Sequence, residues 1–305
     1  MGIKLTKLTI AGIGVSTIES IPVFHYYPGG STLRVITYSH NYVPFDCDDL
    51  FSICIYGKGP DVFEPINIDL EHLLALSKNF HVDIVLFEGL NPLESLQIEV
   101  IEMFHDQGYK LGVRIIGGLE IDLPPKLDLL VIDDVHTFSE DPGLIIDTMN
   151  LLEKISGNSN PWVEVNTYMN KPAFSPIAPL IKHTGKKRIP IHIHIADHEG
   201  GGPISDLYSR ARNMNPFTYI HNPLYPYLDT HCPYCGAPIA IREDGILLSL
   251  EAPENKCWKC GNPLPLRGKV RKKTPRNLLI VTGTEKWLSI REMKALNSFF
   301  QGTLD

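Results

Sequence analysis

The sequence lacks the features that mark several protein classes. No uninterrupted apolar run approaches the roughly 20 residues that a transmembrane helix needs. Six cysteines in 305 residues are few for a secreted disulfide scaffold. The first residues contain no apolar segment followed by a cleavage site, as a signal peptide would. We therefore expect a soluble, cytoplasmic protein that does not bind membranes.

The composition favours a folded α/β protein. Hydrophobic residues make up 43% of the chain and charged residues 21%, with a net charge of −7. This apolar content suffices for a packed core, and the charge is too low for an intrinsically disordered chain. The length allows one large domain or two smaller ones.

Short β-branched runs alternate with amphipathic segments up to about residue 222. Strands such as VDIVLF and LDLLVID are almost continuously apolar, which is typical of strands covered on both faces. About six βα units fit a partial TIM-type barrel or a doubly wound sheet better than a full eight-unit barrel of roughly 250 residues. The expected strands are 33–38, 82–87, 111–116, 127–132, 162–168, 189–195 and 217–221, and the expected helices are 69–80, 92–108, 143–155, 175–185 and 205–214.

The character of the sequence changes after residue 222. A segment rich in proline and turn residues leads into four cysteines between positions 232 and 260, and a basic run follows at 267–276. A strand-like stretch at 277–283 and an amphipathic helix at 285–300 end the chain. We therefore expect a partial barrel over 1–222, a small cysteine-rich module over 223–266, and a basic segment, strand and helix over 267–305.

Four cysteines form two CxxCG motifs separated by 21 residues. Two residues between thiolates let both sulfurs of a pair reach one tetrahedral ion, and the following glycine permits the tight turn that this requires. Four thiolates leave no open coordination position. The spacing therefore predicts a structural Zn²⁺ held in a zinc ribbon, in preference to two disulfides or a redox pair, by Cys232, Cys235, Cys257 and Cys260.

Five stretches resemble one known family. They are IPVFHYYPGGSTLRVITYSHNYVPFDC (21–47), VDIVLFEGLNP (82–92), PWVEVNTYMN (161–170), IPIHIHIADH (189–198) and FTYIHNPLYPYLDTHCPYCGAPI (217–239). Together they resemble radical-SAM proteins of the glycyl-radical-enzyme (pyruvate formate-lyase) activating type, most closely the AmmeMemoRadiSam branch. The resemblance implies a six-unit partial barrel followed by a C-terminal zinc ribbon.

The motifs that carry radical chemistry in that family are degenerate here. The family's CxxxCxxC motif falls on His40, Pro44 and Cys47, so one thiolate of three remains, and the other nearby cysteine, Cys54, has the wrong spacing. A [4Fe–4S] cluster held by cysteines needs three or four of them. The family's SAM-contacting motif falls on 89–92 and reads Gly-Leu-Asn-Pro, without its acidic residue. We therefore expect no [4Fe–4S] cluster and no radical-SAM catalysis.

Polar residues follow several of the expected strands, at the barrel end where functional groups collect. Side chains 192 and 194 share one face of a strand, so this HxH pair can chelate a metal. The alternative is that these histidines only line the barrel and are held there by hydrogen bonds. In that case Cys47 is an unreactive side chain that packs in the barrel. The candidate residues at the barrel mouth are His40, Cys47, Glu88, His192, His194 and His198.

The basic run beside the ribbon can contact nucleic acid. Lysine and arginine neutralise phosphates, and an exposed tryptophan can stack on a base. A solvated linker is the competing interpretation. The candidate residues are Trp258, Lys269, Arg271, Lys272, Lys273 and Arg276.

Three hypotheses for function follow. The leading one is a non-radical binding or scaffold protein with a structural zinc site and an unidentified protein or ribonucleoprotein partner. The second is a metal-dependent enzyme that uses the histidine cluster. The third is a module that binds RNA through the ribbon and the basic run.

Overall fold

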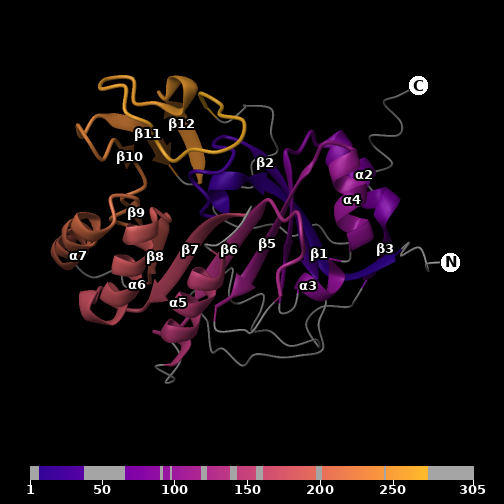
Figure 1. The fold of residues 1–305 in the computed structure, drawn as a ribbon, viewed down its shortest axis with the longest axis horizontal. Helices are drawn as coiled ribbons and strands as arrows, with labels where there is room; N and C mark the ends of the chain where they lie inside the picture. Colours follow the sequence, from indigo (N-terminus) through magenta and orange to yellow (C-terminus); the bar gives the residue numbers. More distant parts are fainter. Residues whose placement is uncertain are drawn as a thin grey trace.

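A computed structural model of the chain describes residues 7–37, 66–89, 92–96, 98–117, 122–137, 143–155, 161–196, 201–243 and 245–273. Within these residues, one large sheet has the strand order β3-β1-β2-β4-β5-β6-β7-β8-β9 (Figure 1). Its strands are β1 (Lys7–Thr17), β2 (Ser31–Thr37), β3 (Ile66–Asp69), β4 (Ile84–Glu88), β5 (Lys110–Ile116), β6 (Leu129–Asp134), β7 (Trp162–Met169), β8 (Ile191–Ile195) and β9 (Thr218–His221).

The seven strands from β2 through β4 to β9 are parallel and follow one another in chain order, whereas β1 pairs antiparallel with β2 and β3. Right-handed crossovers that always step the same way place the described α-helices on one face of the sheet. Apolar side chains of the helices and one sheet face accordingly share a single core. The helices are α2 (Leu70–Asn79), α3 (Pro92–Ser95), α4 (Ile98–Asp106), α5 (Gly143–Ile155), α6 (Phe174–Lys187) and α7 (Gly201–Met214).

The prediction of an α/β protein with a mostly parallel sheet is confirmed, and each expected strand up to residue 221 has a counterpart. The edge strands β3 and β9 do not pair with each other, so the described sheet is open and not a closed barrel. The expected single helix over 92–108 contains two separate helices, α3 and α4. The antiparallel strands β1 and β3 were not predicted. The expected strand at 277–283 and helix at 285–300 lie outside the described residues.

The two faces of the sheet differ in chemistry. Alternate side chains of each strand, such as Val85 and Phe87, pack beneath the helices. On the opposite face, which we call the inner face, Ile84, Leu86 and other apolar residues near the strand starts contact Ile18 from the connection between β1 and β2. Towards the strand ends, the inner face carries polar side chains. The change from apolar to polar side chains along the strands makes the carboxyl half of the inner face the candidate location of a site.

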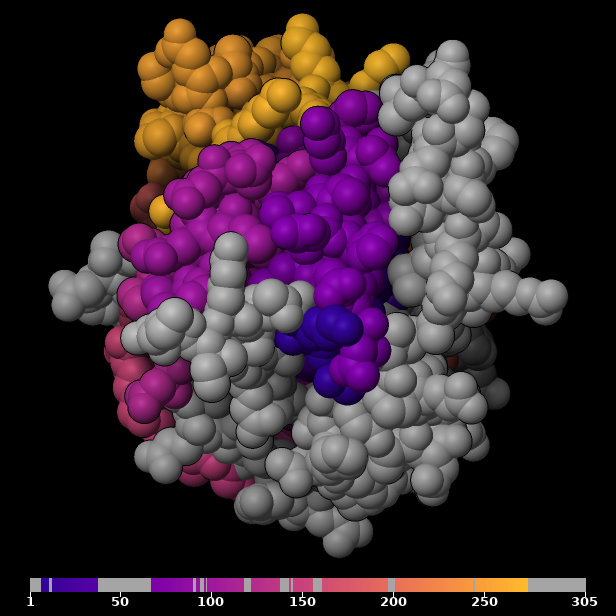
Figure 2. Space-filling view, turned by 90° about the vertical axis from the view of Figure 1, so that its right-hand side faces the viewer, coloured from indigo at the N-terminus to yellow at the C-terminus, as the bar shows by residue number. Residues whose placement is uncertain are grey.

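The cysteine-rich module is a three-stranded sheet of β10 (Thr230–His231), β11 (Pro238–Glu243) and β12 (Ile246–Leu250). Its small core runs from Cys232 to Leu266, with Val270 packed against it. The module contacts the large sheet through the β1–β2 connection: Tyr27 donates its N–H to the carbonyl of Arg267, and Arg267 donates to that of His25, both at 2.8 Å. Figures 1 and 2 show the module, in orange to yellow, against one end of the large sheet.

The chain beyond β9 folds back along that strand before it enters the module. Ile220 and Tyr227 exchange two backbone hydrogen bonds, at 3.0 and 2.9 Å. The expected domain boundary at 222/223 therefore falls within a segment that still belongs to the edge of the large sheet.

Candidate functional site

The four cysteines of the module come together as predicted. Their sulfur atoms lie within 4.8 Å of one another, with Cys232 to Cys260 at 3.6 Å and Cys235 to Cys257 at 3.7 Å. A tetrahedral zinc with bonds of about 2.3 Å needs sulfur separations of about 3.8 Å. The group is therefore compatible with one four-coordinate metal such as zinc.

The two CxxCG segments adopt the same local structure. Gly236 and Gly261 both have φ of +72°, a conformation that favours glycine, and each donates its N–H at 2.9 Å to the carbonyl of the first cysteine of its motif. The side-chain amide of Asn262 also points at the sulfur of Cys260, at 3.4 Å. These turns direct the two sulfurs of each motif towards the sulfurs of the other.

Glu88 is buried at the carboxyl end of β4 and is paired with an arginine. Arg34, on β2, donates through Nε at 2.6 Å and through Nη2 at 2.9 Å to the two carboxylate oxygens of Glu88. Both side chains are at most 3% exposed. The next residue, Gly89, has φ of +130°, and a Cβ there would lie 2.8 Å from the carbonyl oxygen of Thr37. This tight turn holds the ends of β2 and β4 together.

Arg114, on β5, extends this network across the sheet. It donates to Asp133 through Nε at 2.7 Å and Nη2 at 3.2 Å, and to the hydroxyl of Tyr168 at 2.9 Å; its Nη1 lies 3.6 Å from Glu88. Asp133 also accepts from Tyr168 at 2.8 Å and from the amide of Asn166 at 3.0 Å. All of these side chains are buried away from water. Their charges are therefore balanced by one another.

Three histidines continue the row on β8 and β9. The rings of His194 and His221 are stacked with centroids 4.4 Å apart, and Tyr168 stacks on the other side of His194 at 4.6 Å. His192 lies one layer nearer the strand starts, and its Nδ1 is 3.0 Å from Nε2 of His221. His192 is fully buried, whereas His194 and His221 are partly exposed. Burial lowers the pKa of all three rings well below the ordinary value of histidine.

Glu164, on β7, joins this row to the β1–β2 connection. It accepts backbone N–H groups from Phe24 at 2.9 Å and His25 at 2.8 Å, the indole N–H of Trp162 at 3.0 Å, and Nε2 of His192 at 2.9 Å. Burial raises the pKa of this carboxyl group.

The cysteine-rich module touches the same network through Arg242. Its guanidinium lies 4.1 Å from the centre of the Phe24 ring and donates to the Phe24 carbonyl at 3.0 Å and to Thr230 at 2.8 Å. Thr230 in turn bonds Tyr219, whose hydroxyl lies 2.6 Å from Nε2 of His25. Module and inner face therefore share one hydrogen-bonded system.

The predicted barrel-mouth residues are only partly described. Glu88, His192 and His194 lie on the inner face, with His192 fully buried below the level of His194; His40, Cys47 and His198 lie outside the described residues. Among the described side chains, the four cysteines are the one group of three or more that can hold a metal.

The residues predicted to bind nucleic acid differ in their exposure, and one of them lies outside the described residues. Trp258 is 52% exposed, with its indole N–H donated at 2.9 Å to the Pro238 carbonyl. Arg271 is instead bound to the body of the protein, through Asp83 at 2.8 Å and the Gly29 carbonyl at 3.1 Å. The three lysines of the run, at 269, 272 and 273, are exposed, and Arg276 is not described.

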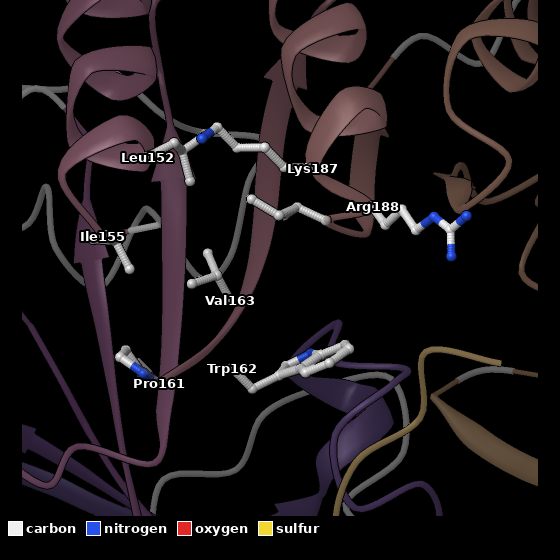
Figure 3. A pocket seen from close by; sticks show the side chains of 8 residues that line it. Leu152, Ile155, Pro161, Trp162, Val163, Lys187 and Arg188 are labelled. Carbon is white, nitrogen blue, oxygen red and sulfur yellow. The ribbon is translucent and has the colours of Figure 1, made fainter. Parts of the chain in front are cut away.

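An apolar hollow of about 320 Å³ lies between α5, α6 and the starts of β7 and β8, away from the polar row. Figure 3 shows Lys187 extended towards Leu152, while the guanidinium of Arg188 points away from the hollow. Lys187 is paired with Glu153 at 2.8 Å. The charged groups around this hollow do not converge on its interior, so we place the candidate site on the inner face.

Sequence reasoning missed most of the polar row. The signal was present, because a polar residue at alternate positions of an otherwise apolar strand marks one face. Each missed residue occupies such a position: Arg34, Arg114, Asp133, Glu164, Asn166, Tyr168 and His221.

No protein-family model matches the chain, and no curated protein matches it in sequence. Within the described residues, no helix combines the length and apolarity that a membrane span requires.

Proposed function

We propose that this protein is a non-radical relative of radical-SAM proteins that binds a small ligand on its inner sheet face. The observation that carries this proposal is the row of mutually bonded polar side chains, most of them buried, from Arg34 on β2 to the partly exposed His221 on β9. Burying charges costs several kcal/mol per ion before their pairing offsets the loss. Hydrophobic residues would cover that face at less cost, which supports a role in binding.

Three features support the radical-SAM relationship and its partial barrel. Parallel strands in strict chain order with helices on one face are the arrangement of a barrel wall. The glycine at position 89 sits at the end of β4, where the resemblance places the SAM-contacting motif, and its backbone conformation demands glycine. A cysteine-rich module follows the last parallel strand.

The non-radical part of the proposal depends on the sequence. The positions that correspond to the cluster motif hold His40, Pro44 and Cys47, and one thiolate cannot hold a [4Fe–4S] cluster. In the same proposal, the metal of the module is zinc with a structural role, because four cysteine sulfurs leave no position for a substrate.

Metal analysis after anaerobic purification tests this proposal. We expect about one zinc per chain, lost in Cys232→Ser, and no iron or acid-labile sulfide. A brown protein with about four irons per chain would show that radical chemistry is retained. Cys257→Ser should behave like Cys232→Ser, and Cys54→Ser, outside the module, is the matched control that should keep its zinc.

The metal-enzyme hypothesis gains no support from the described histidines. The planes of the His194 and His221 rings differ by only 13°. A metal bond to imidazole lies in the ring plane, so two stacked rings cannot both point a lone pair at one ion. Both nitrogens of His192 are already hydrogen-bonded.

Nucleic-acid binding is the second candidate function, favoured by one observation. Each of the two CxxCG motifs carries one exposed aromatic side chain between its cysteines: Tyr234 is 49% exposed and Trp258 is 52% exposed. Charge reversal of Lys272 and Lys273 to Glu should weaken salt-dependent RNA binding by about tenfold if these lysines contact phosphates. Binding that is absent at low salt would reject this function.

A further inference from the structure

The protonation of His221 follows from its hydrogen-bonded neighbours. Three N–H groups, from Phe24, His25 and Trp162, donate to Glu164 and favour its carboxylate form against the effect of burial. A carboxylate only accepts, so Nε2 of His192 must donate to it. Nδ1 of a neutral His192 must then accept, and the donor facing it at 3.0 Å is Nε2 of His221. This leaves a lone pair on Nδ1 of His221, to which no described residue donates.

An independent chain of bonds gives the same result for His194. Asp133 accepts the amide hydrogen of Asn166, which fixes the amide so that its oxygen faces His194. Nε2 of His194 lies 3.2 Å from that oxygen and must donate to it. Nδ1 of His194 therefore also carries a lone pair without a described partner.

The two lone pairs lie side by side. Each ring directs Nε2 to a residue on the preceding strand and one layer nearer the strand starts, Asn166 for His194 and His192 for His221. The rings therefore have the same orientation and repeat at their stacking distance of 4.4 Å. Their nitrogens form a pair of parallel acceptors at the partly exposed end of the row.

Among the described residues, the charges of this network cancel. Arg34, Arg114 and Arg242 are matched by Glu88, Asp133 and Glu164 in the same network. A site with balanced charge neither attracts an anion nor compensates an ammonium group. The histidines add no charge, because burial holds their pKa values low.

We propose that Nδ1 of His194 and Nδ1 of His221 form a paired acceptor site for an uncharged ligand that bears neighbouring hydroxyl groups, of the sugar or polyol class. This inference rests on the proposed binding function of the inner face and names its ligand class. His192 and Glu164, and likewise Asn166 and Asp133, act as positioning residues that hold each ring in the accepting tautomer.

Long-range ¹H–¹⁵N spectra of the full chain labelled at histidine test the tautomers. We expect His192, His194 and His221 to be neutral with the proton on Nε2 at pH 7. His25 is the internal control with the opposite tautomer, because its Nδ1 must donate to the Pro265 carbonyl at 2.9 Å. A proton on Nδ1 of His194 or His221 would overturn the inference and leave the metal-analysis test of the proposed function unaffected.

Titration of the same sample identifies the ligand class. myo-Inositol and D-glucose should shift the Nδ1 resonances of His194 and His221 while His25 and His105 stay unchanged, and 1,3-diaminopropane and inorganic phosphate should shift neither. The shift at His194 should be lost in His221→Asn, whose fold is checked by the unchanged His25 signal. If only the diamine or phosphate shifts these rings, or if no probe does, the assignment to hydroxyl-bearing ligands is wrong.

Discussion

At the scale of single residues, the arginines of the inner face are buried and depend on their hydrogen-bond acceptors. Arg114 is 1% exposed and meets Asp133, Tyr168 and Glu88 with its guanidinium. Such an arginine is stable only while its acceptors are present, because an unpaired buried charge is costly. The network therefore depends strongly on each carboxylate.

Asp133→Ala should lower the free energy of unfolding by about 3–5 kcal/mol, since it leaves Arg114 buried without its main partner. Urea denaturation followed by circular dichroism measures the change. Glu102→Ala is the matched control, because the Glu102–Lys126 pair is more than half exposed and should contribute less than about 1 kcal/mol. Equal losses in the two variants would show that burial does not set the strength of these pairs.

Substitution of Glu19 is predicted to raise the free energy of unfolding, in contrast to substitution of Asp133. Its Oε1 accepts the Gly29 N–H at 2.6 Å, while Oε2 has no hydrogen-bond partner in the described structure, and burial raises the pKa of the carboxyl group to about 7. The folded state then binds a proton more tightly than the unfolded state, so stability is lost as pH rises from about 4.5 to 7.

Glu19→Gln should therefore stabilise the protein at pH 8, by up to about 3 kcal/mol, and have little effect at pH 4.5. Urea denaturation at both pH values measures the difference. Glu71→Gln, on the exposed side of α2, is the control that should show no such dependence. A gain that is equal at both pH values would contradict the ionisation of Glu19 as its cause.

At the scale of elements, the cysteine-rich module and the β1–β2 connection form one unit. Backbone bonds join Tyr27 to Arg267 and Arg267 to His25, and Arg242 reaches from β11 onto Phe24. Because the metal is expected to hold the ribbon together, its removal should loosen this connection as well.

Removal of the module's metal by a chelator should reduce the hydrogen-exchange protection of the amides of Tyr27 and Arg267 by at least tenfold. The amides of Val85 and Val113, inside the parallel sheet, should keep their protection and serve as controls. Loss of protection confined to the cysteine turns would mean that the ribbon and the connection fold independently.

The sequence predicts the elements better than it predicts the site. Runs such as 82–87 reveal their strands because both faces are buried, and the period of the helices is equally clear. β1 was missed because it pairs antiparallel with both of its neighbours, β2 and β3, outside the βα pattern. The polar network could not be assembled because its partners are brought together by the sheet: Arg34 and Glu88 are 54 residues apart, and Phe24 and Glu164 are 140.

At the scale of the whole molecule, the buried histidines make the fold sensitive to acid. Burial lowers the pKa of His25 to about 4, and the pKa values of His192, His194 and His221 are lowered as well. The unfolded chain binds protons at these positions first, so stability is lost as pH falls below about 6.5. Glu19 and Glu164, with raised pKa values, oppose this trend.

The free energy of unfolding should fall between pH 6.5 and 4, with about 3 kcal/mol from His25 alone. The fall should be steeper in Glu19→Gln, which lacks one opposing group. Urea titrations at pH 6.5, 5.5 and 4.5 in both proteins measure it. A flat profile in Glu19→Gln would show that these histidines are not held neutral by burial.

The return of the chain along β9 has a consequence for the behaviour of the protein in concentrated solution. The last strand of an open sheet presents unpaired amides and carbonyls, to which a strand of another molecule can add. Here the backbone of Tyr227 takes both hydrogen bonds of Ile220. The segment thus shields the edge against intermolecular strand addition, and shortening the connection between β9 and the ribbon would expose the edge to aggregation.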